Sequence, residues 1–250
     1  MGEVYDDYLR YIKTILNDKK EKWRFKSNSN YTRILEHVSF ATGQEYLNVI
    51  IKKFNNLFLR EKKRLIELCK LNDSYGQPNK FVYANFTTCS PTNLRYILHS
   101  LLILHHIQKK KMNQVDIIEI GGGYGGLYVF IKNLAPLFNI SLNTYTIFDL
   151  LEASKLQKKY LQGLGYPDVN CCQIDNFKNL KADSFLISNY AFSEIPLKLQ
   201  KEYTENIINP FISHGFLTWN YIPVYKFIEN VEIESINEYP RTGNNYYVYF

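Results

Sequence analysis

The stretch Asp116-Ile-Ile-Glu-Ile-Gly-Gly-Gly-Tyr-Gly-Gly-Leu-Tyr128 decides the fold of this chain. Its apolar first half is typical of a buried strand, and its glycines can adopt positive φ angles that let a ligand approach the backbone. A helix is expected to begin directly after the glycines, as in loops that bind a cofactor at a strand-to-helix turn. The same composition also suits a plain tight turn, so the neighbouring residues must decide between the two.

Glu119 favours a particular class of cofactor. It lies two residues before Gly121, where a dinucleotide-binding loop usually continues with apolar residues. A dinucleotide carries a negative diphosphate, whereas S-adenosylmethionine carries a sulfonium and an ammonium group, and an acid beside the loop favours the cation. No Gly-Lys-Ser/Thr sequence of a phosphate-binding loop occurs. We therefore expect S-adenosylmethionine as the cofactor, bound by Glu119, Gly121, Gly122, Gly123 and Tyr124.

Strands and helices alternate from residue 112 to the end of the chain. The strands are expected at 115–120, 142–148, 169–174, 184–190, 216–221, 231–236 and 246–250. Helical patterns separate the first five, which implies right-handed crossovers, and the last two are close enough to form an antiparallel pair. The sequence therefore predicts an α/β fold with a doubly wound, mostly parallel, seven-stranded Rossmann-like sheet over 112–250.

The first 111 residues have a helical pattern instead. One helix is expected to start at Thr42, where a capping box would end at Glu45, and another at Ser90 with Pro91 in its first turn. The segment 72–85 between them carries turn formers and aromatic residues, among them Tyr83. We expect region 1–111 to be a helical extension that serves as a lid and binds the acceptor, with Tyr83 and Arg95 as contacts.

Composition and charge narrow the class of protein. The 250 residues are 46% hydrophobic and 22% charged, as in globular proteins, and no apolar run is long enough to span a bilayer. Since the first residues are also acidic, we expect a cytoplasmic protein with no membrane span. The net charge of +6 is scattered over expected helix faces, so nucleic acid is not the expected partner. The four cysteines lack zinc-type spacing, so we expect no metal, and the oligomeric state is not predicted.

Polar residues follow the second and third strands of the sheet. Asp149 is expected at the edge where such folds bind ligands, where it can accept hydrogen bonds from both ribose hydroxyls, with Leu150 beside it. Asp175 or Asn176 can take the adenine amino group, and Phe177 can pack on the adenine face. The alternatives are a helix cap for Asp149 and an ordinary polar turn after the third strand.

The fourth strand ends in the polar sequence Ser188-Asn-Tyr-Ala-Phe-Ser-Glu194. Asn189 is expected next to the methyl donor, and Tyr190, Ser193 and Glu194 follow in the loop that would hold an acceptor. Because a hydroxyl is a poor nucleophile at neutral pH, a general base is expected to help, and Glu194 is the candidate. Helix capping is the alternative role for Ser193 and Glu194.

Several motifs together resemble the sugar O-methyltransferase family, a branch of the class I S-adenosylmethionine-dependent enzymes. They are EIGGGYGGL at 119–127, YTIFDL at 145–150 and ISNYAFSEI at 187–195, with weaker similarity at 75–78, 90–96 and 238–245. The resemblance implies methyl transfer to a hydroxyl of a sugar, sugar nucleotide or glycan. It also implies cofactor contacts at Glu119, Gly121, Gly123, Asp149, Asp175 and Asn189. It does not extend to the first helices.

Two other functions remain open from the sequence. The basic charge balance allows an RNA or other polymer methyltransferase, although the fourth-strand loop lacks the Asp/Asn-Pro-Pro-aromatic pattern of base methylation. A cofactor-binding partner module without catalysis is the other alternative. The acids Glu119, Asp149 and Glu194 argue against the module, because a module without catalysis would not need all three.

Overall fold

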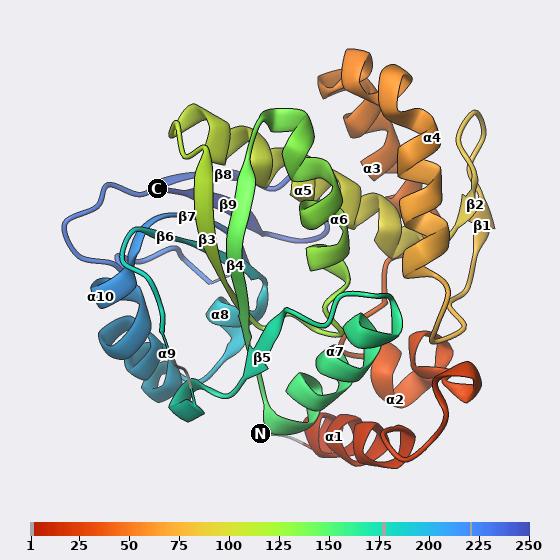
Figure 1. Ribbon diagram of the computed structural model, residues 1–250, viewed down its shortest axis with the longest axis horizontal. Coiled ribbons are helices and arrows are strands. Elements are labelled where there is room, and N and C mark those ends of the chain that lie inside the picture. The colour runs from red at the N-terminus through yellow and green to blue at the C-terminus, as the bar shows by residue number, and fades with distance from the viewer. Residues whose placement is uncertain (1–2, 177–178, 221) are drawn as a thin grey trace.

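The computed structural model describes residues 3–176, 179–220 and 222–250, and its centre is a seven-stranded sheet (Figure 1). The strands of this sheet are β3 (Gln114–Ile120), β4 (Ser141–Phe148), β5 (Asn170–Cys172), β6 (Ser184–Asn189), β7 (Ile212–Trp219), β8 (Glu234–Asn237) and β9 (Tyr246–Tyr249). Their order is β5-β4-β3-β6-β7-β9-β8, with β3 to β7 parallel and β9 antiparallel to both β7 and β8. The predicted mostly parallel, Rossmann-like sheet is confirmed, including its antiparallel edge.

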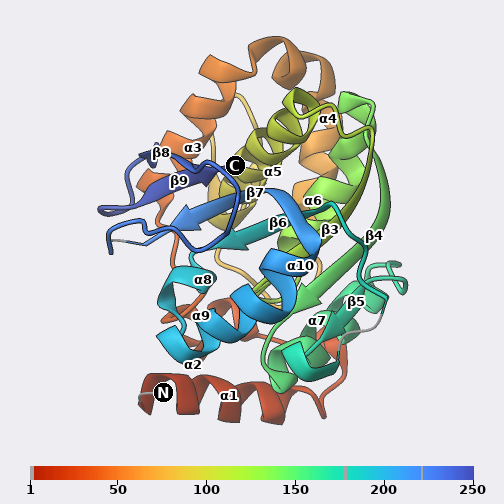
Figure 2. The same ribbon diagram turned by 90° about the vertical axis from the view of Figure 1, so that its left-hand side faces the viewer.

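Helices cover both faces of the sheet because alternate residues of each strand face opposite sides. In β3, Ile117 packs into a cluster with α5 (Pro91–Lys109) and α6 (Gly126–Leu134), whereas Ile118 packs into a second cluster with α9 (Leu197–Tyr203) and the π-helical turn after it. Figures 1 and 2 show these helices on opposite sides of the sheet. The helices are α1 (Glu3–Ile15), α2 (Ser29–Thr32), α3 (Phe40–Lys53), α4 (Asn55–Asn72), α5 (Pro91–Lys109), α6 (Gly126–Leu134), α7 (Leu151–Gly163), α8 (Ala191–Glu194), α9 (Leu197–Tyr203) and α10 (Asn209–Phe211).

The predicted start of α3 is wrong by two residues. The helix begins at Phe40, and Ser39 caps it by accepting a 3.1 Å hydrogen bond from the amide of Thr42. A serine at this position satisfies an amide that the first helical turn leaves free, so it replaces the capping box expected from Thr42 and Glu45. The start of α5 at Pro91, directly after Ser90, is confirmed.

Helix α5 joins the N-terminal region to the sheet. It is buried along most of its length and packs against α3 on one side and α6 on the other. One continuous hydrophobic cluster runs from Tyr8 and Leu47 through α5 to Ile117 and Phe216. The packing therefore shows no break at the predicted boundary between 111 and 112, and the role of region 1–111 as an acceptor-binding lid stays a prediction.

Two remaining features complete the fold. A two-stranded hairpin of β1 (Phe81–Val82) and β2 (Thr88–Cys89) lies outside α3 and α4 (Figure 1). Within the described ranges, none of the helices combines the length and apolar character that crossing a bilayer requires.

Candidate cofactor and acceptor site

The glycine loop follows β3 at the point where the strand order reverses. Gly121, Gly123 and Gly125 have φ angles of +75°, +60° and +86°, which glycine adopts at little steric cost. The loop closes on itself through a 2.8 Å hydrogen bond from the Gly125 amide to the Gly122 carbonyl, and α6 begins directly afterwards. In open α/β sheets this reversal forms the crevice that binds ligands. The predicted strand, loop and helix are therefore all present.

Glu119 lies beneath this loop. It is 1% exposed, and its carboxylate is so close that a Cβ added to Gly122 would be 3.3 Å from it. The pKa of Glu119 is raised to about 7, chiefly by burial and also by the neighbouring Asp149, although a 2.9 Å hydrogen bond from the Tyr145 hydroxyl opposes the shift. A buried acid here would be stabilised by a nearby positive charge.

Asp149 follows β4 beside the loop. Its Oδ1 accepts a 2.8 Å hydrogen bond from the Leu150 amide, and its Oδ2 accepts a 2.7 Å bond from Nε2 of Gln157 in α7. Burial raises the pKa of Asp149 to about 6, although hydrogen bonds from Leu150 and Gln157 oppose the shift. Helix α7 has no side-chain cap, so the alternative of Asp149 as the cap of this helix finds no support.

The third strand contributes less than predicted within the described residues. Asp175 is exposed in a short 3-10 turn (Ile174–Asn176) and lines a surface cavity of about 590 Å³ with Glu202 and Asn206. The backbone of Asn176 ends this turn, and Phe177 lies outside the described residues. The adenine contacts expected here stay predictions.

The loop after β6 is tied to β7 by several polar contacts. The Asn189 Oδ1 accepts a 3.0 Å hydrogen bond from Thr218. The Ser193 hydroxyl donates to the Tyr190 carbonyl at 2.9 Å and accepts from the Asn220 amide at 3.0 Å, so it is already used inside the loop. These contacts hold the loop in place at the edge of the crevice.

Glu194 and Tyr190 each meet a polar partner from a later segment. Glu194 is exposed at the end of α8, where its Oε1 accepts a hydrogen bond from the Asn220 side chain, and partial burial raises its pKa. Tyr190 has a φ of +68° and donates a 2.5 Å hydrogen bond from its hydroxyl to Oε1 of the buried Glu238.

Several buried polar atoms gather near Asn189, and of their residues only Asn189 was predicted from the sequence as a site residue. Within the part of the chain that the structure describes, the Tyr46 hydroxyl, both ring nitrogens of His99 and Nδ2 of Asn189 form no hydrogen bond of good geometry, although Asn189 lies close to His99 and Tyr190 close to Tyr46. The His99 ring lies 6.1 Å from that of Tyr46 and 6.3 Å from that of Tyr190. Burial and the nearby Arg95 lower the pKa of His99 to about 3, so its ring is neutral at ordinary pH. Buried groups without partners are costly unless a ligand meets them.

The two predicted contacts from the N-terminal half lie in different surroundings. Arg95 is 8% exposed on α5 and faces the rings of Tyr96 and Tyr190 at 5.8 and 5.7 Å. Tyr83 is buried against the backbone of Gly43 and stacks on Phe40 with ring centres 5.3 Å apart. The structure thus brings Arg95 to Tyr190, while Tyr83 packs between α3 and the hairpin, and its acceptor role stays a prediction.

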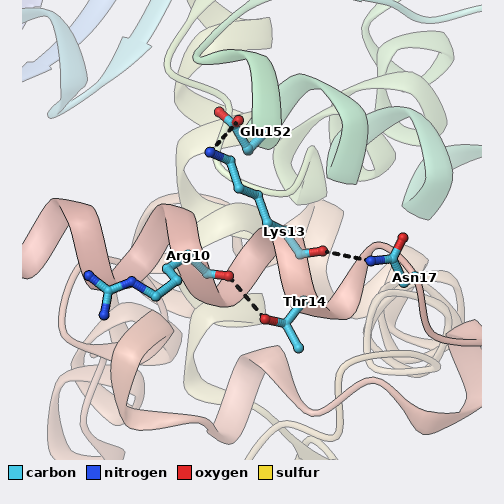
Figure 3. A network of polar contacts seen from close by, with 5 residues as sticks. All are labelled: Arg10, Lys13, Thr14, Asn17 and Glu152. Carbon is cyan, nitrogen blue, oxygen red and sulfur yellow. Dashed lines mark hydrogen bonds and ion pairs between the residues drawn. The ribbon is translucent and has the colours of Figure 1, made fainter.

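Polar contacts hold the N-terminal helix α1 against α7, whose Gln157 donates a hydrogen bond to the glycine loop. Lys13 of α1 forms a 3.3 Å ion pair with Glu152 of α7, and Figure 3 shows this pair above hydrogen bonds within α1. Nζ of Lys159, also in α7, donates to the carbonyls of Leu16 and Asp18 at 2.7 and 2.9 Å. Helix α1 therefore lies next to the helix whose Gln157 holds Asp149.

In the described residues, no group of three or more His, Cys, Asp or Glu side chains is placed to hold a metal ion.

Comparisons with known proteins give similarity in fold at low sequence identity. No protein-family model matches the chain, and no curated protein matches it. An S-adenosylmethionine-dependent methyltransferase from Clostridium acetobutylicum has 19% identity and a TM-score of 0.38, with 48% of this chain and 49% of that one covered. The methyltransferase domain of the citrinin polyketide synthase has 14% identity and a TM-score of 0.45, with 64% and 53% covered. The plantazolicin methyltransferase BpumL, solved with S-adenosylhomocysteine, has 17% identity and a TM-score of 0.38, with 64% and 61% covered. The chain thus spans about half of the first solved structures that it matches.

Proposed function

We propose that this protein is an S-adenosylmethionine-dependent O-methyltransferase that acts on a hydroxyl of a sugar, sugar nucleotide or glycan. The observation that carries the proposal is the pairing of two acids, the buried Glu119 and the partly buried Asp149, with a glycine loop at the reversal of the strand order. A diphosphate would be repelled by these acids, whereas a sulfonium cofactor would be attracted.

The residues at the crevice fit this cofactor. Asp149 would hold the ribose hydroxyls, Asp175 would hold the adenine, and the glycine loop would let the ligand approach the backbone. In the described ranges, the Oε1 of Gln157 is buried beside Asp149 without a hydrogen-bond partner, so a donor group of the ligand can satisfy it. When bound, S-adenosylmethionine supplies a methyl group that its sulfonium makes electrophilic.

The chain's own residues would position the acceptor and accept its proton. Glu194 would take the hydroxyl proton, and its hydrogen bond to Asn220 would orient the carboxylate. Its raised pKa makes it a better proton acceptor than an ordinary glutamate. The density of polar groups around Asn189, Tyr190 and Glu194 supports an acceptor with several hydroxyls, as does the resemblance of this segment to sugar O-methyltransferases.

The test is to incubate the purified protein with methyl-labelled S-adenosylmethionine and a panel of free sugars, nucleotide sugars, glycans and RNA, and to analyse the products by mass spectrometry. Label in a sugar hydroxyl is the expected result. Label in RNA would show that the acceptor is a polymer and not a sugar. Calorimetric binding of NAD without any response to S-adenosylmethionine would reject the methyltransferase itself.

A further inference from the structure

Arg95 is a buried cation without an acceptor. It is 8% exposed, and its guanidinium faces two tyrosine rings, from Tyr96 and Tyr190. Among the described residues it forms no hydrogen bond and no ion pair, although the carboxylate of Glu36 is close enough for the two charges to influence each other. A guanidinium has five N–H donors, so an anionic group that reaches Arg95 can accept several hydrogen bonds from it. This position therefore favours an anionic ligand.

Glu36 is the matching anion, and it comes from the segment between α2 and α3. Its Oε1 is buried without a hydrogen-bond partner in the described residues. Its backbone has a φ of +48°, a left-handed conformation that is costly for glutamate. The preceding Leu35 packs on the glycine loop, 3.4 Å from where a Cβ on Gly123 would lie. This contact places the segment that carries Glu36 against the glycine loop.

Lys26 is the other cation near Glu36, but its ammonium group is already partnered. Its Nζ donates to the carbonyl of Asn72 and, at 3.1 Å, to the hydroxyl of Tyr160, and it lies 4.1 Å from the centre of the Tyr124 ring. Lys26 makes no ion pair with Glu36 in the described ranges. Thr92 and Tyr124 lie within hydrogen-bonding reach of the Glu36 carboxylate, but its Oε1 has no hydrogen-bond partner in the described residues, so this oxygen can accept from a positively charged ligand group.

The strand order indicates which part of the cofactor would meet these two residues. The ligand-binding edge of the sheet runs from β5 through β4 and β3 to β6, and so from Asp175 past Asp149 and the glycine loop to Tyr190. With adenine at Asp175 and ribose at Asp149, the amino-acid end of the cofactor extends toward β6. Arg95 lies on that side, against the ring of Tyr190.

We propose that Arg95 and Glu36 together bind the amino-acid end of S-adenosylmethionine, Arg95 through the α-carboxylate and Glu36 through the α-ammonium group. The inference rests on the proposed function and assigns to the cofactor a residue, Arg95, that the sequence predicted for the acceptor. An α-amino acid group carries both charges, so it satisfies both side chains at once. The segment that carries Glu36 is then part of the cofactor site.

Calorimetric titration of the full chain with four ligands separates the two contacts. S-adenosylmethionine and its decarboxylated form share the sulfonium and the ammonium and differ in the carboxylate. S-adenosylhomocysteine and 5′-methylthioadenosine are neutral thioethers that differ in the whole amino-acid group. The variants are Arg95→Met and Glu36→Gln, and the matched controls are the exposed Arg64→Met and Glu45→Gln.

Arg95→Met is expected to raise the Kd of S-adenosylmethionine by about 30-fold or more, the scale of hydrogen bonds to charged groups, and that of the decarboxylated form by less than about threefold. Glu36→Gln is expected to weaken both sulfonium ligands, because both keep the ammonium group. Neither variant should change the Kd of 5′-methylthioadenosine, and the controls should match the wild type.

Three results would overturn the assignment. Equal weakening of S-adenosylhomocysteine and 5′-methylthioadenosine would mean that Arg95 only supports the shape of the pocket. An unchanged Kd for S-adenosylmethionine in Arg95→Met would remove Arg95 from the cofactor site. A wild-type chain that binds none of the four ligands would reject the proposed function as well. If Arg95→Met does not fold, Arg95→Lys carries the same test, because one ammonium group cannot replace the two parallel N–H donors of a guanidinium.

Discussion

Gln157 donates a 2.7 Å hydrogen bond from its Nε2 to Oδ2 of Asp149, two helical turns earlier in the chain. The same nitrogen donates to the carbonyl of Gly123 at 3.0 Å. One fully buried side chain therefore connects the glycine loop to the acid after β4 and holds both in one orientation. Such positioning matters because a ligand gains affinity when the groups that receive it are already ordered.

Gln157→Leu is expected to raise the Kd of S-adenosylhomocysteine by about tenfold, the scale of one hydrogen bond to a charged group. The substitution leaves the Asp149 carboxylate without its orienting partner. Titration calorimetry measures the effect, and Gln162→Leu, at an exposed position of the same helix, is the control. An equal change in both variants would mean that α7 has simply been destabilised.

Asp149→Ala should weaken binding of S-adenosylmethionine by about 1.5 to 3 kcal/mol, because two hydrogen bonds from ribose to a carboxylate are lost. The exposed Asp168→Ala removes a nearby charge without touching the crevice and should bind normally. A wild-type dissociation constant for Asp149→Ala would remove this residue from the cofactor site.

Glu119 should make the ligand-free protein less stable as pH rises. Its pKa is raised from 4.5 to about 7 in the folded chain, so its stabilising contribution is complete below about 4.5 and is lost as pH rises through 7. Glu119→Gln removes this titration and should gain up to about 3 kcal/mol relative to the wild type between pH 4.5 and pH 8. Urea unfolding at the two pH values measures the difference in free energy of unfolding between Glu119→Gln and the wild type, with the exposed Glu67→Gln as control. A pH-independent difference would show that Glu119 has an ordinary pKa.

Glu194→Gln should lower kcat by about 10² while S-adenosylmethionine binds normally, because the amide cannot accept the acceptor's proton. His99→Gln is the informative comparison, since this buried neutral ring lies beside Asn189. Steady-state kinetics on the sugar found by product analysis measure both, with the exposed Glu229→Gln as control. Loss of kcat in the His99 variant and wild-type kcat in the Glu194 variant would move the role of base to His99.

Deletion of residues 1–110 should unfold the remainder, whereas deletion of 1–19 should leave a folded chain that binds S-adenosylhomocysteine more weakly. The longer deletion removes α5, whose apolar side chains complete the core against α6 and β3. The shorter one removes α1 and its contacts with Glu152 and Lys159. Circular dichroism shows whether each shortened chain is folded, and calorimetry measures its affinity for S-adenosylhomocysteine. A folded 111–250 fragment that binds the cofactor would instead support an independent lid.

The sequence by itself determined the sheet and the position of the glycine loop and its two acids. Strand, loop and helix follow from local rules, in which period-two apolar runs form strands and clustered glycines allow positive φ, so Glu119, Gly121 and Asp149 could be placed at the edge of the sheet. Alternation of strands and helices was enough for the mostly parallel order. The exact start of α3 was missed because two capping signals lie within three residues of each other.

Only the tertiary structure decided which distant polar groups come together. The charges of Glu36 and Arg95 influence each other although they lie 59 positions apart in the chain, and no periodic pattern encodes that proximity. Ser193 has the composition of a ligand contact, but its hydroxyl is used by Tyr190 and Asn220. The physical reason is that the periodicity of a sequence indicates only which face of a helix or strand is apolar. The partner of a buried polar side chain depends instead on how whole elements pack against one another.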